Sequence, residues 1–546
     1  MTSSALAAAS TAQNYGEVFT RRWVVEAMLD LAEYTPEKDL THLTVVEPSV
    51  GTGAFWGPLV ERLVQSALEV QRPFESLAGC LRGWDLRPEH VDTCKALTAS
   101  VLLASGCDPL TATLLADAWL RTGDFLLDEE VPRADLVVGN PPYIRYDDLP
   151  SELAYAYRRR WSTMSGRGDI FVGFIQRGLE LLNDGGRLTY ICADRWMRNA
   201  YGADLREFVS THAAVEAIWQ MHNVDAFEAA VSAYPAIVQF RNGPQGEAVI
   251  ADCGARFTQA DALSIIRFAQ DPSKAERLHL PDTAAHRVHG WFTGKALWPA
   301  GSPDRIALLE DLNERFQLLE ATGVKVGIGI ATGADKAYIV DASVDVEPDR
   351  KLPIVVTNDI RSGEFSYGGK VLLNPWAPDG SIINLDDFPK LKRELSAHAG
   401  LRERFVAKRN PGTWWRTIDK VNYSLIERPK ILIQDMKALM TPVLDPGGHY
   451  PAHNLYHLTS DRWDLEVLGG LLLSRVTQAF IEAYGVKMRG GTLRMQAQYL
   501  RTIRVPAPET INQAIAQDLR TAFRTRDRGL ATKASMEAYG IDDIVW

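Results

Sequence analysis

The sequence predicts an α/β protein: a doubly wound parallel sheet in the first half of the chain, followed by a second, mixed α+β domain. Three observations support this fold class. Strand-like apolar runs alternate with helix-like runs up to about residue 240, as in strand–helix–strand units. Turns rich in glycine or proline follow several of the strand-like runs. Beyond that point the runs become shorter, and tryptophan and basic residues cluster.

The expected strands of the first half each lead into a turn or a polar residue. The first strand precedes a glycine-rich turn and a helix, and the strand that ends at Gly139 leads into Asn140. Ligands of such sheets bind at the carboxyl ends of the strands, so these following residues form the candidate site. In chain order we expect strands over 43–46, 81–84, 134–139 and 187–193, and helices over 55–70 and 170–182, the second helix ended by Gly185 and Gly186.

A change in composition after Arg241 indicates a domain boundary. Gly243-Pro244 and the stretch 281–305, rich in proline, glycine and histidine, are typical of a connection between domains. The sequence therefore predicts a flexible tail over 1–13, a catalytic domain over 14–245, a connecting region over 246–305 and a second domain over 306–546.

The composition is that of a soluble globular protein, with 46% hydrophobic and 23% charged residues among 546. No apolar stretch approaches the ~18 residues of a membrane helix, and the first 13 residues lack the basic start of a signal peptide. We therefore expect a cytoplasmic protein without a membrane partner. The five cysteines form no Cys-x-x-Cys pair, and Pro451 interrupts the evenly spaced His449, His453 and His457, so no metal site is expected.

Asn140-Pro141-Pro142-Tyr143, directly after a buried strand, is the most informative motif. The Asn140 side-chain oxygen and the Pro141 carbonyl offer two acceptors to an amine, because consecutive prolines stiffen the turn and remove backbone donors. Tyr143 offers a flat face on which a base can stack. The pattern suits methyl transfer to a planar nitrogen, and a plain proline-rich turn is the alternative.

Three further features lie at strand ends. Glu47–Phe55, which contains Gly51 and Gly53, opens a helix, where the backbone approaches a ligand closely and the helix start favours a carboxylate. Asp85 suits hydrogen bonds to two ribose hydroxyls, with a helix cap as the alternative. Asp124-Phe125 suits an adenine amine and ring, with a turn aspartate as the alternative.

In order and placement these motifs resemble the gamma group of S-adenosylmethionine-dependent DNA amino-methyltransferases, which includes type II and Eco57I-like enzymes with a carboxyl-terminal specificity domain. The resemblance extends to Gly16–Thr20, Asp169–Phe174 and the segment from Val224 to Phe240, in which Pro235 replaces the usual aliphatic residue. It implies a Rossmann-like methyltransferase sheet, S-adenosylmethionine as cofactor and a carboxyl-terminal target-recognition domain.

The resemblance also implies a role for individual residues. The catalytic residues would be Asn140, Pro141, Pro142 and Tyr143, with Tyr143 and Phe227 stacked on the two faces of the target base. The cofactor-binding residues would be Thr20, Glu47, Ser49, Gly51, Gly53, Asp85, Leu86, Asp124, Phe125, Asn140, Pro142 and Phe174.

The implied activity is site-specific methylation of N6 of a flipped-out adenine in double-stranded DNA, in a restriction-modification or phage-defence system whose nuclease is encoded separately. Two alternatives remain open: methylation of cytosine N4, for which the motif more often begins with serine, and a non-catalytic DNA-binding module that retains the methyltransferase shell. Enzymes that methylate a glutamine amide or a guanine amine in RNA also carry the motif, but they lack so long a carboxyl-terminal domain. No Glu-x-Lys triplet occurs and only a short tail precedes Gly16, so a fused nuclease is not expected.

The charge distribution suits a DNA partner on one face only. The net charge is −10, yet residues 390–437 hold 12 Lys/Arg against 5 Asp/Glu, and residues 487–504 hold five basic residues and no acidic one. Core packing is the alternative for the two tryptophans among the candidate DNA contacts. These candidates are Trp414, Trp415, Arg416, Lys487, Arg489 and Arg494.

Overall fold

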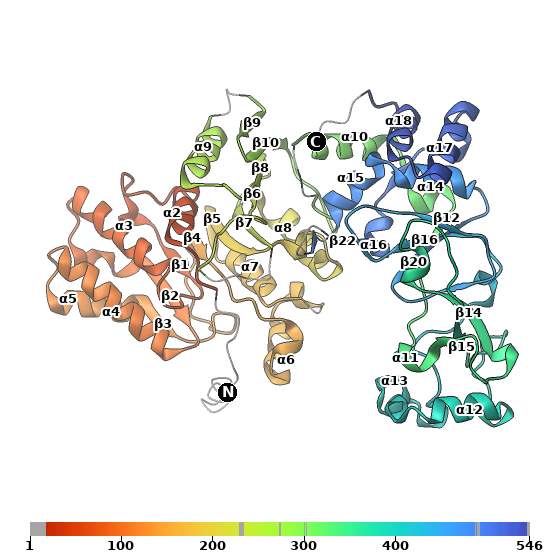
Figure 1. Cartoon of the computed structure of the whole chain (residues 1–546). Coiled ribbons are helices and arrows are strands. Elements are labelled where there is room, and N and C mark those ends of the chain that lie inside the picture. The colour runs from red at the N-terminus through yellow and green to blue at the C-terminus, as the bar shows by residue number, and fades with distance from the viewer. Residues whose placement is uncertain are drawn as a thin grey trace. The chain divides into compact units, whose positions relative to one another are not determined.

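The computed structural model forms two compact units, Met1–Pro303 and Asp304–Trp546 (Figure 1). The structure describes residues 18–166, 168–228, 234–271, 275–299, 301, 303–485, 487–488 and 492–542. None of the helices in these ranges is long and apolar enough to span a membrane.

A ten-stranded mixed sheet runs through the first unit, in the order β3-β2-β1-β4-β5-β7-β6-β8-β10-β9. Neighbouring strands from β3 to β5 are parallel, whereas β7 runs antiparallel between β5 and β6. The predicted α/β class is therefore confirmed, with antiparallel strands added. The strands are β1 Val45–Glu47, β2 Leu81–Asp85, β3 Leu120–Thr122, β4 Ala134–Gly139, β5 Leu182–Ala193, β6 Ala214–Gln220, β7 Pro235–Arg241, β8 Glu247–Cys253, β9 Arg277–Leu280 and β10 Thr283–His289.

Helices cover both faces of this sheet, which explains why its central strands are almost entirely buried. One hydrophobic cluster joins the sheet to α2, α3, α4, α5 and α9, and a second joins it to α6, α7 and α8. The helices are α2 Arg22–Leu31, α3 Trp56–Glu69, α4 Pro88–Ala104, α5 Pro109–Trp119, α6 Ser151–Arg160, α7 Phe171–Glu180, α8 Ala203–His212 and α9 Gln259–Gln270.

The predicted connecting region over 246–305 is corrected by the structure. Most of this stretch forms β8, α9, β9 and β10, and its strands extend one edge of the sheet. β8 pairs parallel with β6, and β10 pairs antiparallel with β8. Gly254 and Gly290 directly follow β8 and β10, so they mark turns at strand ends rather than a connection between domains.

Two local expectations also change. Gly185 and Gly186 do not end a helix, because α7 ends at Glu180 and both glycines lie within β5. The register of β5 against β4 shifts at this point, so the glycines occupy a bulge. Pro235 is the first residue of β7, a position where its missing N–H is tolerated, and its carbonyl accepts a hydrogen bond from Met221 N at 2.9 Å. The strand in the late motif therefore forms.

The second unit is α+β, as predicted, with several small sheets instead of one large one. The largest have the orders β12-β20-β16-β18 and β13-β15-β14-β19, beside the smaller β17-β22-β21 and β11-β23. Its strands are β11 Gln317–Leu318, β12 Val324–Ile328, β13 Ile339–Asp341, β14 Lys351–Val355, β15 Lys370–Leu373, β16 Lys430–Gln434, β17 Met436–Lys437, β18 Val443–Asp445, β19 Tyr450–Pro451, β20 Leu455–Ser460, β21 Lys487–Met488, β22 Thr492–Arg494 and β23 Arg504–Val505.

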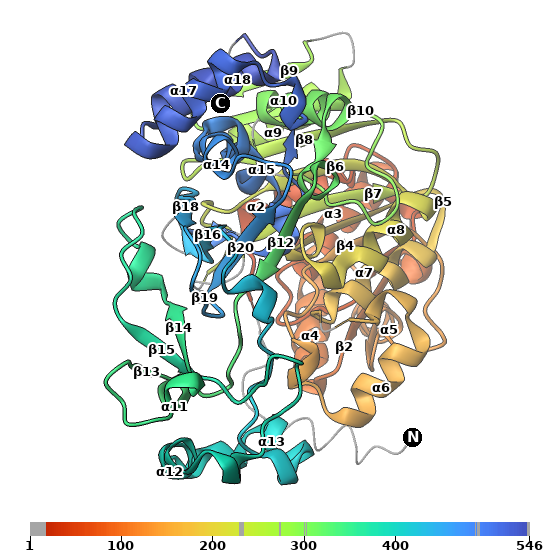
Figure 2. The ribbon, with the colours of Figure 1, turned by 90° about the vertical axis from the view of Figure 1, so that its right-hand side faces the viewer.

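The helices of the second unit gather at its two ends. Figure 2 shows α14, α15, α17 and α18 packed together at one end, and α12 with α13 at the other. The helices are α10 Pro303–Arg315, α11 Asp335–Tyr338, α12 Pro389–Ser396, α13 Phe405–Arg409, α14 Leu465–Leu473, α15 Arg475–Tyr484, α16 Ala497–Leu500, α17 Gln513–Thr525 and α18 Arg528–Tyr539.

Candidate active site

Asn140 follows β4 directly, and its side-chain amide is held in one orientation. Nδ2 donates to the carbonyl of Val18 at 2.9 Å and to Thr20 Oγ1 at 3.3 Å. The backbone carbonyl of Asn140 accepts a hydrogen bond from Ser49 Oγ at 3.1 Å. Oδ1, by contrast, is buried and has no partner among the described residues. Two acceptors fix the amide nitrogen, so the oxygen is left as an acceptor for another molecule.

The rest of the motif supplies a backbone carbonyl and an aromatic ring. Pro141 is buried, and no residue of the described chain donates a hydrogen bond to its carbonyl. The Tyr143 hydroxyl is buried without a partner, and burial raises the pKa of Tyr143 well above its usual range. Its ring lies 6.3 Å from that of Phe171, tilted by 57°. Tyr143 is therefore a neutral aromatic side chain at physiological pH.

The segment before α2 brings the predicted second stacking residue to the motif. Thr20 forms an antiparallel bridge with Phe227, flanked by a hydrogen bond from Arg21 N to the Ala226 carbonyl at 3.0 Å. Phe227 is 6% exposed. Thr20 Oγ1 also accepts a hydrogen bond from Asn140 Nδ2. Thr20 therefore contacts both Phe227 and the Asn140 motif.

Asp85, at the end of β2, holds the backbone on both sides of the candidate site through its two carboxylate oxygens. Oδ2 accepts a hydrogen bond from Gly51 N at 2.9 Å, so the carboxylate holds the glycine turn that follows β1. Oδ1 accepts from Arg87 N at 2.9 Å, at the start of α4, and contacts His90 Nδ1 at 3.2 Å. Gly51 has φ +52°, in the region that favours glycine. The turn and the carboxylate are thus one preformed unit.

Glu47, the last residue of β1, is a buried acid with an unsatisfied oxygen. It is 1% exposed, and Oε2 has no hydrogen-bond partner in the described ranges. Burial, together with the nearby Asp85 carboxylate, raises the pKa of Glu47 well above its usual value. An unpaired buried carboxyl destabilises the folded chain, so its presence here indicates a site for a donor or cation.

Asp124 and Phe125 lie within a polar and aromatic cluster. Asp124 Oδ2 accepts a hydrogen bond from Tyr157 OH at 2.7 Å, and Oδ1 accepts from Leu126 N at 2.9 Å. Burial raises the pKa of Asp124, and the Tyr157 hydrogen bond opposes that shift. The Phe125 ring stacks on that of Phe174, with centroids 5.4 Å apart. Each ring is at most 6% exposed, so the two predicted aromatic contacts act as one packed pair.

The remaining cofactor candidates lie at the same carboxyl edge of the sheet. Leu86 directly follows β2 and is 45% exposed, which leaves an apolar side chain open to a ligand beside Asp85. Gly53 has φ +98°, and an added Cβ would lie 3.1 Å from Leu97 Cδ2. A larger residue there would therefore disturb the packing of the turn against α4. Pro142 is partly buried next to Asn140.

Sequence reasoning missed two residues that organise this site. Tyr157, on α6, reaches Asp124 from 33 residues away. Arg177, on α7, donates to the carbonyls of Phe125 and Asp128 and lies over the Phe125 ring at 4.8 Å. Burial lowers the pKa of Arg177 to about 10. Neither residue belongs to a recognisable motif, and only the spacing of apolar residues on their helices could have suggested that they face inward.

The candidate DNA contacts of the second unit are mostly engaged in packing. Trp414 is 8% exposed within a hydrophobic cluster, and Trp415 Nε1 donates to the Ile383 carbonyl at 3.2 Å. Arg416 Nη1 donates to Asn410 Oδ1 at 2.8 Å. Arg494 pairs with Asp435 at 2.6 Å. The Lys487 side chain and Arg489 lie outside the described residues. Both tryptophans are thus accounted for as core residues.

In the described ranges, no group of three or more His, Cys, Asp or Glu is arranged so that it could hold a metal ion. Of the three evenly spaced histidines, His449 contacts Asp445 at 3.0 Å in the second unit. Burial and the nearby Lys430 lower the pKa of His457 to about 4. His449 and His457 therefore belong to the packing of the small sheets, whereas His453 is exposed.

The chain is similar to known proteins over nearly its full length. The family model of the Eco57I restriction-modification methylase matches residues 118–227, which contain Asp124, the Asn140 motif and Phe227. The type II methyltransferase M.PaeR7I of Pseudomonas aeruginosa is 40% identical over 98% of this chain and 94% of its own length. M.XhoI of Xanthomonas vasicola is 37% identical over 97% of both chains.

Two solved structures share the fold. The type IIL restriction-modification enzyme MmeI in complex with DNA has a TM-score of 0.58 at 10% identity, over 95% of this chain and 74% of that one. A nuclease-deletion mutant of the type ISP enzyme LlaGI has a TM-score of 0.52 at 13% identity, over 93% of this chain and 46% of that one. At such identities the likeness shows the fold alone.

Proposed function

Since the chain belongs to the type II DNA methyltransferases of the Eco57I restriction-modification methylase family, we propose that it methylates N6 of a specific adenine in duplex DNA. The observation that carries this proposal is the Asn140 amide. Its nitrogen is held by Val18 and Thr20, and its oxygen is buried without a partner. An exocyclic amine has two N–H donors and needs fixed acceptors of this kind.

The residues around β1, β2 and β4 fit S-adenosylmethionine as the methyl donor. The unpartnered Glu47 carboxyl and the Gly51–Gly53 turn would hold its methionine part, and Asp85 its ribose. Asp124 and the exposed Leu86 would hold its adenine. When bound, this group supplies an electrophilic methyl carbon. Every one of these protein groups is already placed by a strand end or a hydrogen bond, so little ordering is needed on binding.

Asn140 and Pro141 activate the target nitrogen. Adenine N6 is a weak nucleophile because its lone pair is delocalised into the ring. Acceptance of both hydrogens by Asn140 Oδ1 and the Pro141 carbonyl favours a tetrahedral nitrogen, whose lone pair is then available. The same two oxygens stabilise the positive charge that develops on that nitrogen, and alignment of the reacting atoms contributes further. One hydrogen leaves as a proton to solvent after transfer.

Tyr143 and Phe227 would hold the base outside the duplex. Flipping a base costs a few kcal/mol, and stacking on two aromatic faces offsets part of it. The link from Phe227 through Thr20 to Asn140 couples the stacking residue to the acceptor. The second unit would recognise the DNA sequence, and a separately encoded nuclease would complete the restriction-modification system.

Nucleoside analysis tests the proposal directly. Plasmid DNA from cells that express the chain would be digested to nucleosides and analysed by mass spectrometry, with cells that express Asn140→Ala as the control. We expect N6-methyladenine that depends on Asn140, and long-read methylation calling would give its sequence context. N4-methylcytosine would overturn the choice of base, and the absence of any methylated nucleoside would favour the non-catalytic module.

A further inference from the structure

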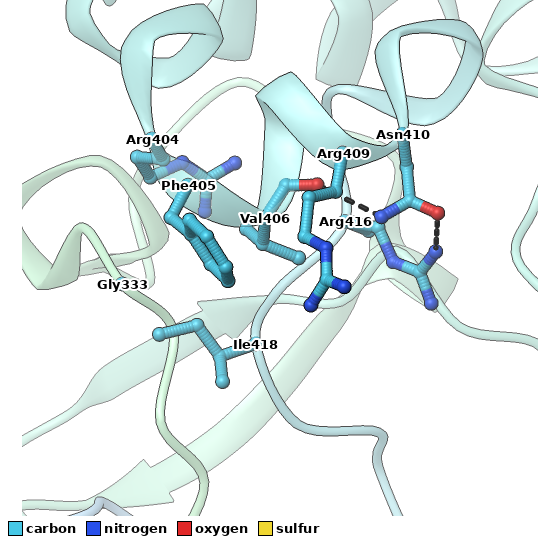
Figure 3. A pocket seen from close by; sticks show the side chains of 8 residues that line it. All are labelled: Gly333, Arg404, Phe405, Val406, Arg409, Asn410, Arg416 and Ile418. Atoms are coloured by element: carbon cyan, nitrogen blue, oxygen red, sulfur yellow. Dashed lines mark hydrogen bonds between the residues drawn. The ribbon is translucent and has the colours of Figure 1, made fainter. Parts of the chain in front are cut away.

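The second unit contains a pocket of about 690 Å³ that the proposed chemistry does not use. Figure 3 shows that α13 forms one wall, with the side chains of Phe405 and Arg409 pointing into the space. Ile418 lies across from α13, Gly333 lies at one end, and Arg416 lies at the other end beside Asn410. The lining therefore combines arginine side chains with exposed apolar ones.

Hydrogen bonds fix the walls of this pocket. The Arg404 guanidinium, at the start of α13, donates to the carbonyls of Thr332 and Trp414, both at 2.8 Å. On the other side of the pocket, Asp419 is hydrogen-bonded to Ala331. Asp419 Oδ2 accepts from Ala331 N at 2.8 Å, and Asp419 N donates to the Ala331 carbonyl at 3.1 Å. A rigid pocket of this kind loses little conformational entropy when a ligand binds.

Basic residues outnumber acidic ones in the segment that forms most of this pocket. Residues 402–420 hold six Lys/Arg and only two acidic residues. Glu403 pairs with Lys408, one of these six, at 3.0 Å, and Asp419 accepts a hydrogen bond from Ala331 N. No carboxylate in the described part of the chain pairs with Arg409, whose guanidinium lies 5.1 Å from the Phe405 ring. In a chain of net charge −10, this charge is suited to an anionic partner.

Apolar side chains are exposed beside this charge. Phe405 is 75% exposed and Ile418 is 54% exposed. Phosphate contacts alone would need no such surface, whereas a nucleotide presents an anionic phosphate next to an apolar sugar and base face. Arginine is well suited to the phosphate because its planar guanidinium donates two parallel hydrogen bonds.

We propose that this pocket binds the backbone of the DNA substrate, with Arg409 on a phosphate and Phe405 with Ile418 against the neighbouring nucleotide. The proposal rests on the proposed function, because it takes duplex DNA as the substrate. Of the candidate DNA contacts expected from the sequence, this pocket contains Arg416, and the structure adds Arg409, Phe405 and Ile418. An acidic segment of a partner protein could offer similar charge, but the apolar pair beside the arginine favours a nucleotide.

Salt-dependent DNA binding by the full-length chain tests this assignment. Fluorescence anisotropy with a labelled duplex of mixed sequence would be measured from about 50 to 200 mM salt. Arg409→Ala should weaken binding about five-fold and reduce the slope of log K against log salt by about one, as expected for one lost phosphate contact. Phe405→Ala should weaken binding by a similar factor without changing the slope, because it removes no charge.

Lys408→Ala is the matched control. It removes the same charge from the same helix, but from a lysine already paired with Glu403, so its effect should stay below about two-fold. Thermal unfolding of each variant would verify that it is folded. If Arg409→Ala binds the duplex as Lys408→Ala does, the assignment is wrong and a protein partner becomes the better occupant.

The two proposals can fail separately. Plasmid methylation by the unmodified chain reports on the proposed function alone. Methylation with no loss of binding in Arg409→Ala would overturn only the pocket assignment. A chain that binds the duplex through Arg409 but yields no methylated nucleoside would overturn only the proposed function.

Discussion

Replacing Asn140 with alanine changes the atom on which the proposed chemistry depends. The variant loses Oδ1, the buried acceptor without a partner, together with the Nδ2 hydrogen bonds to Val18 and Thr20. Loss of one preorganised polar group at a reacting centre typically costs about 3–4 kcal/mol of transition-state stabilisation. We therefore expect the rate of methyl transfer to fall about 10²- to 10³-fold.

The same substitution should also lower the free energy of unfolding. It leaves the Val18 carbonyl and Thr20 Oγ1 without their donor, which costs about 1–3 kcal/mol. Transfer of a tritiated methyl group should therefore be measured in single turnover, well below the unfolding temperature of the variant. Calorimetry with S-adenosylmethionine would verify that the cofactor still binds.

Thr20→Val tests the orientation of the Asn140 amide separately from hydrogen-bond acceptance by Asn140 Oδ1. It removes one of the two bonds that hold Nδ2, at 3.3 Å, but leaves Oδ1 in place. We expect the rate to fall only about two- to ten-fold, the scale of one neutral hydrogen bond. Transfer by Asn140→Ala within about three-fold of the unmodified chain would refute the mechanism. Equal losses in the two variants would mean that orientation of the amide, and not the oxygen itself, is what matters.

Three further substitutions probe the cofactor side. Because the pKa of Glu47 is raised, the folded chain holds a proton that the unfolded chain releases, so stability falls as pH rises above the ordinary carboxyl range. Glu47→Gln should therefore raise the melting temperature of the cofactor-free protein at about pH 8. Calorimetry in different buffers should show that the substitution abolishes proton release on S-adenosylmethionine binding. Equal melting temperatures for the variant and the unmodified chain would contradict the inference that the Glu47 carboxyl is buried and unpaired. Asp85→Ala should weaken cofactor binding by about 1–3 kcal/mol, and an unchanged Kd would reduce Asp85 to a turn and cap residue. Tyr157→Phe should raise the pKa of Asp124 further, since the hydroxyl bond that lowers it is lost, and weaken cofactor binding a few-fold; an unaltered Kd between pH 6 and 8 would show that the Asp124 carboxylate does not contact the cofactor.

In the parallel half of the sheet, β1, β2, β4 and β5 could be predicted because each contains a local apolar run that leads to a polar residue, whereas β3 is Leu-Arg-Thr with two exposed residues and gives no such signal. The remaining strands could not. A Gly-Gly pair suits a helix end and a bulge equally, and only the register of β5 against β4 decides between them. Residues 246–305 have a composition typical of a connection between domains. However, β8 joins the sheet because it pairs with β6, about 30 residues earlier in the chain.

In the candidate site, too, some residues could be predicted from the sequence and others could not. Asn140, Asp85 and Glu47 could be found because their roles depend on what immediately precedes them, a buried strand. The groups that orient them could not, because they lie far away in the sequence: the Val18 carbonyl is 122 residues from Asn140, and Tyr157 is 33 from Asp124. Such pairs leave no periodic signal in a single sequence.

The unsatisfied acceptors of the first unit locate the site without reference to any motif. Among the buried side-chain atoms that lack a hydrogen-bond partner in the described ranges, only two are carboxyl or amide oxygens, Glu47 Oε2 and Asn140 Oδ1. They belong to the ends of β1 and β4, which are neighbours in the sheet. Folded chains rarely leave such atoms unpaired, because each one destabilises the structure. Both oxygens need an N–H donor, and the two proposed ligands each supply one: the ammonium group of S-adenosylmethionine and the amine of the target base. Under the proposed function, this pair of atoms would hold the cofactor and the target base at the ends of adjacent strands.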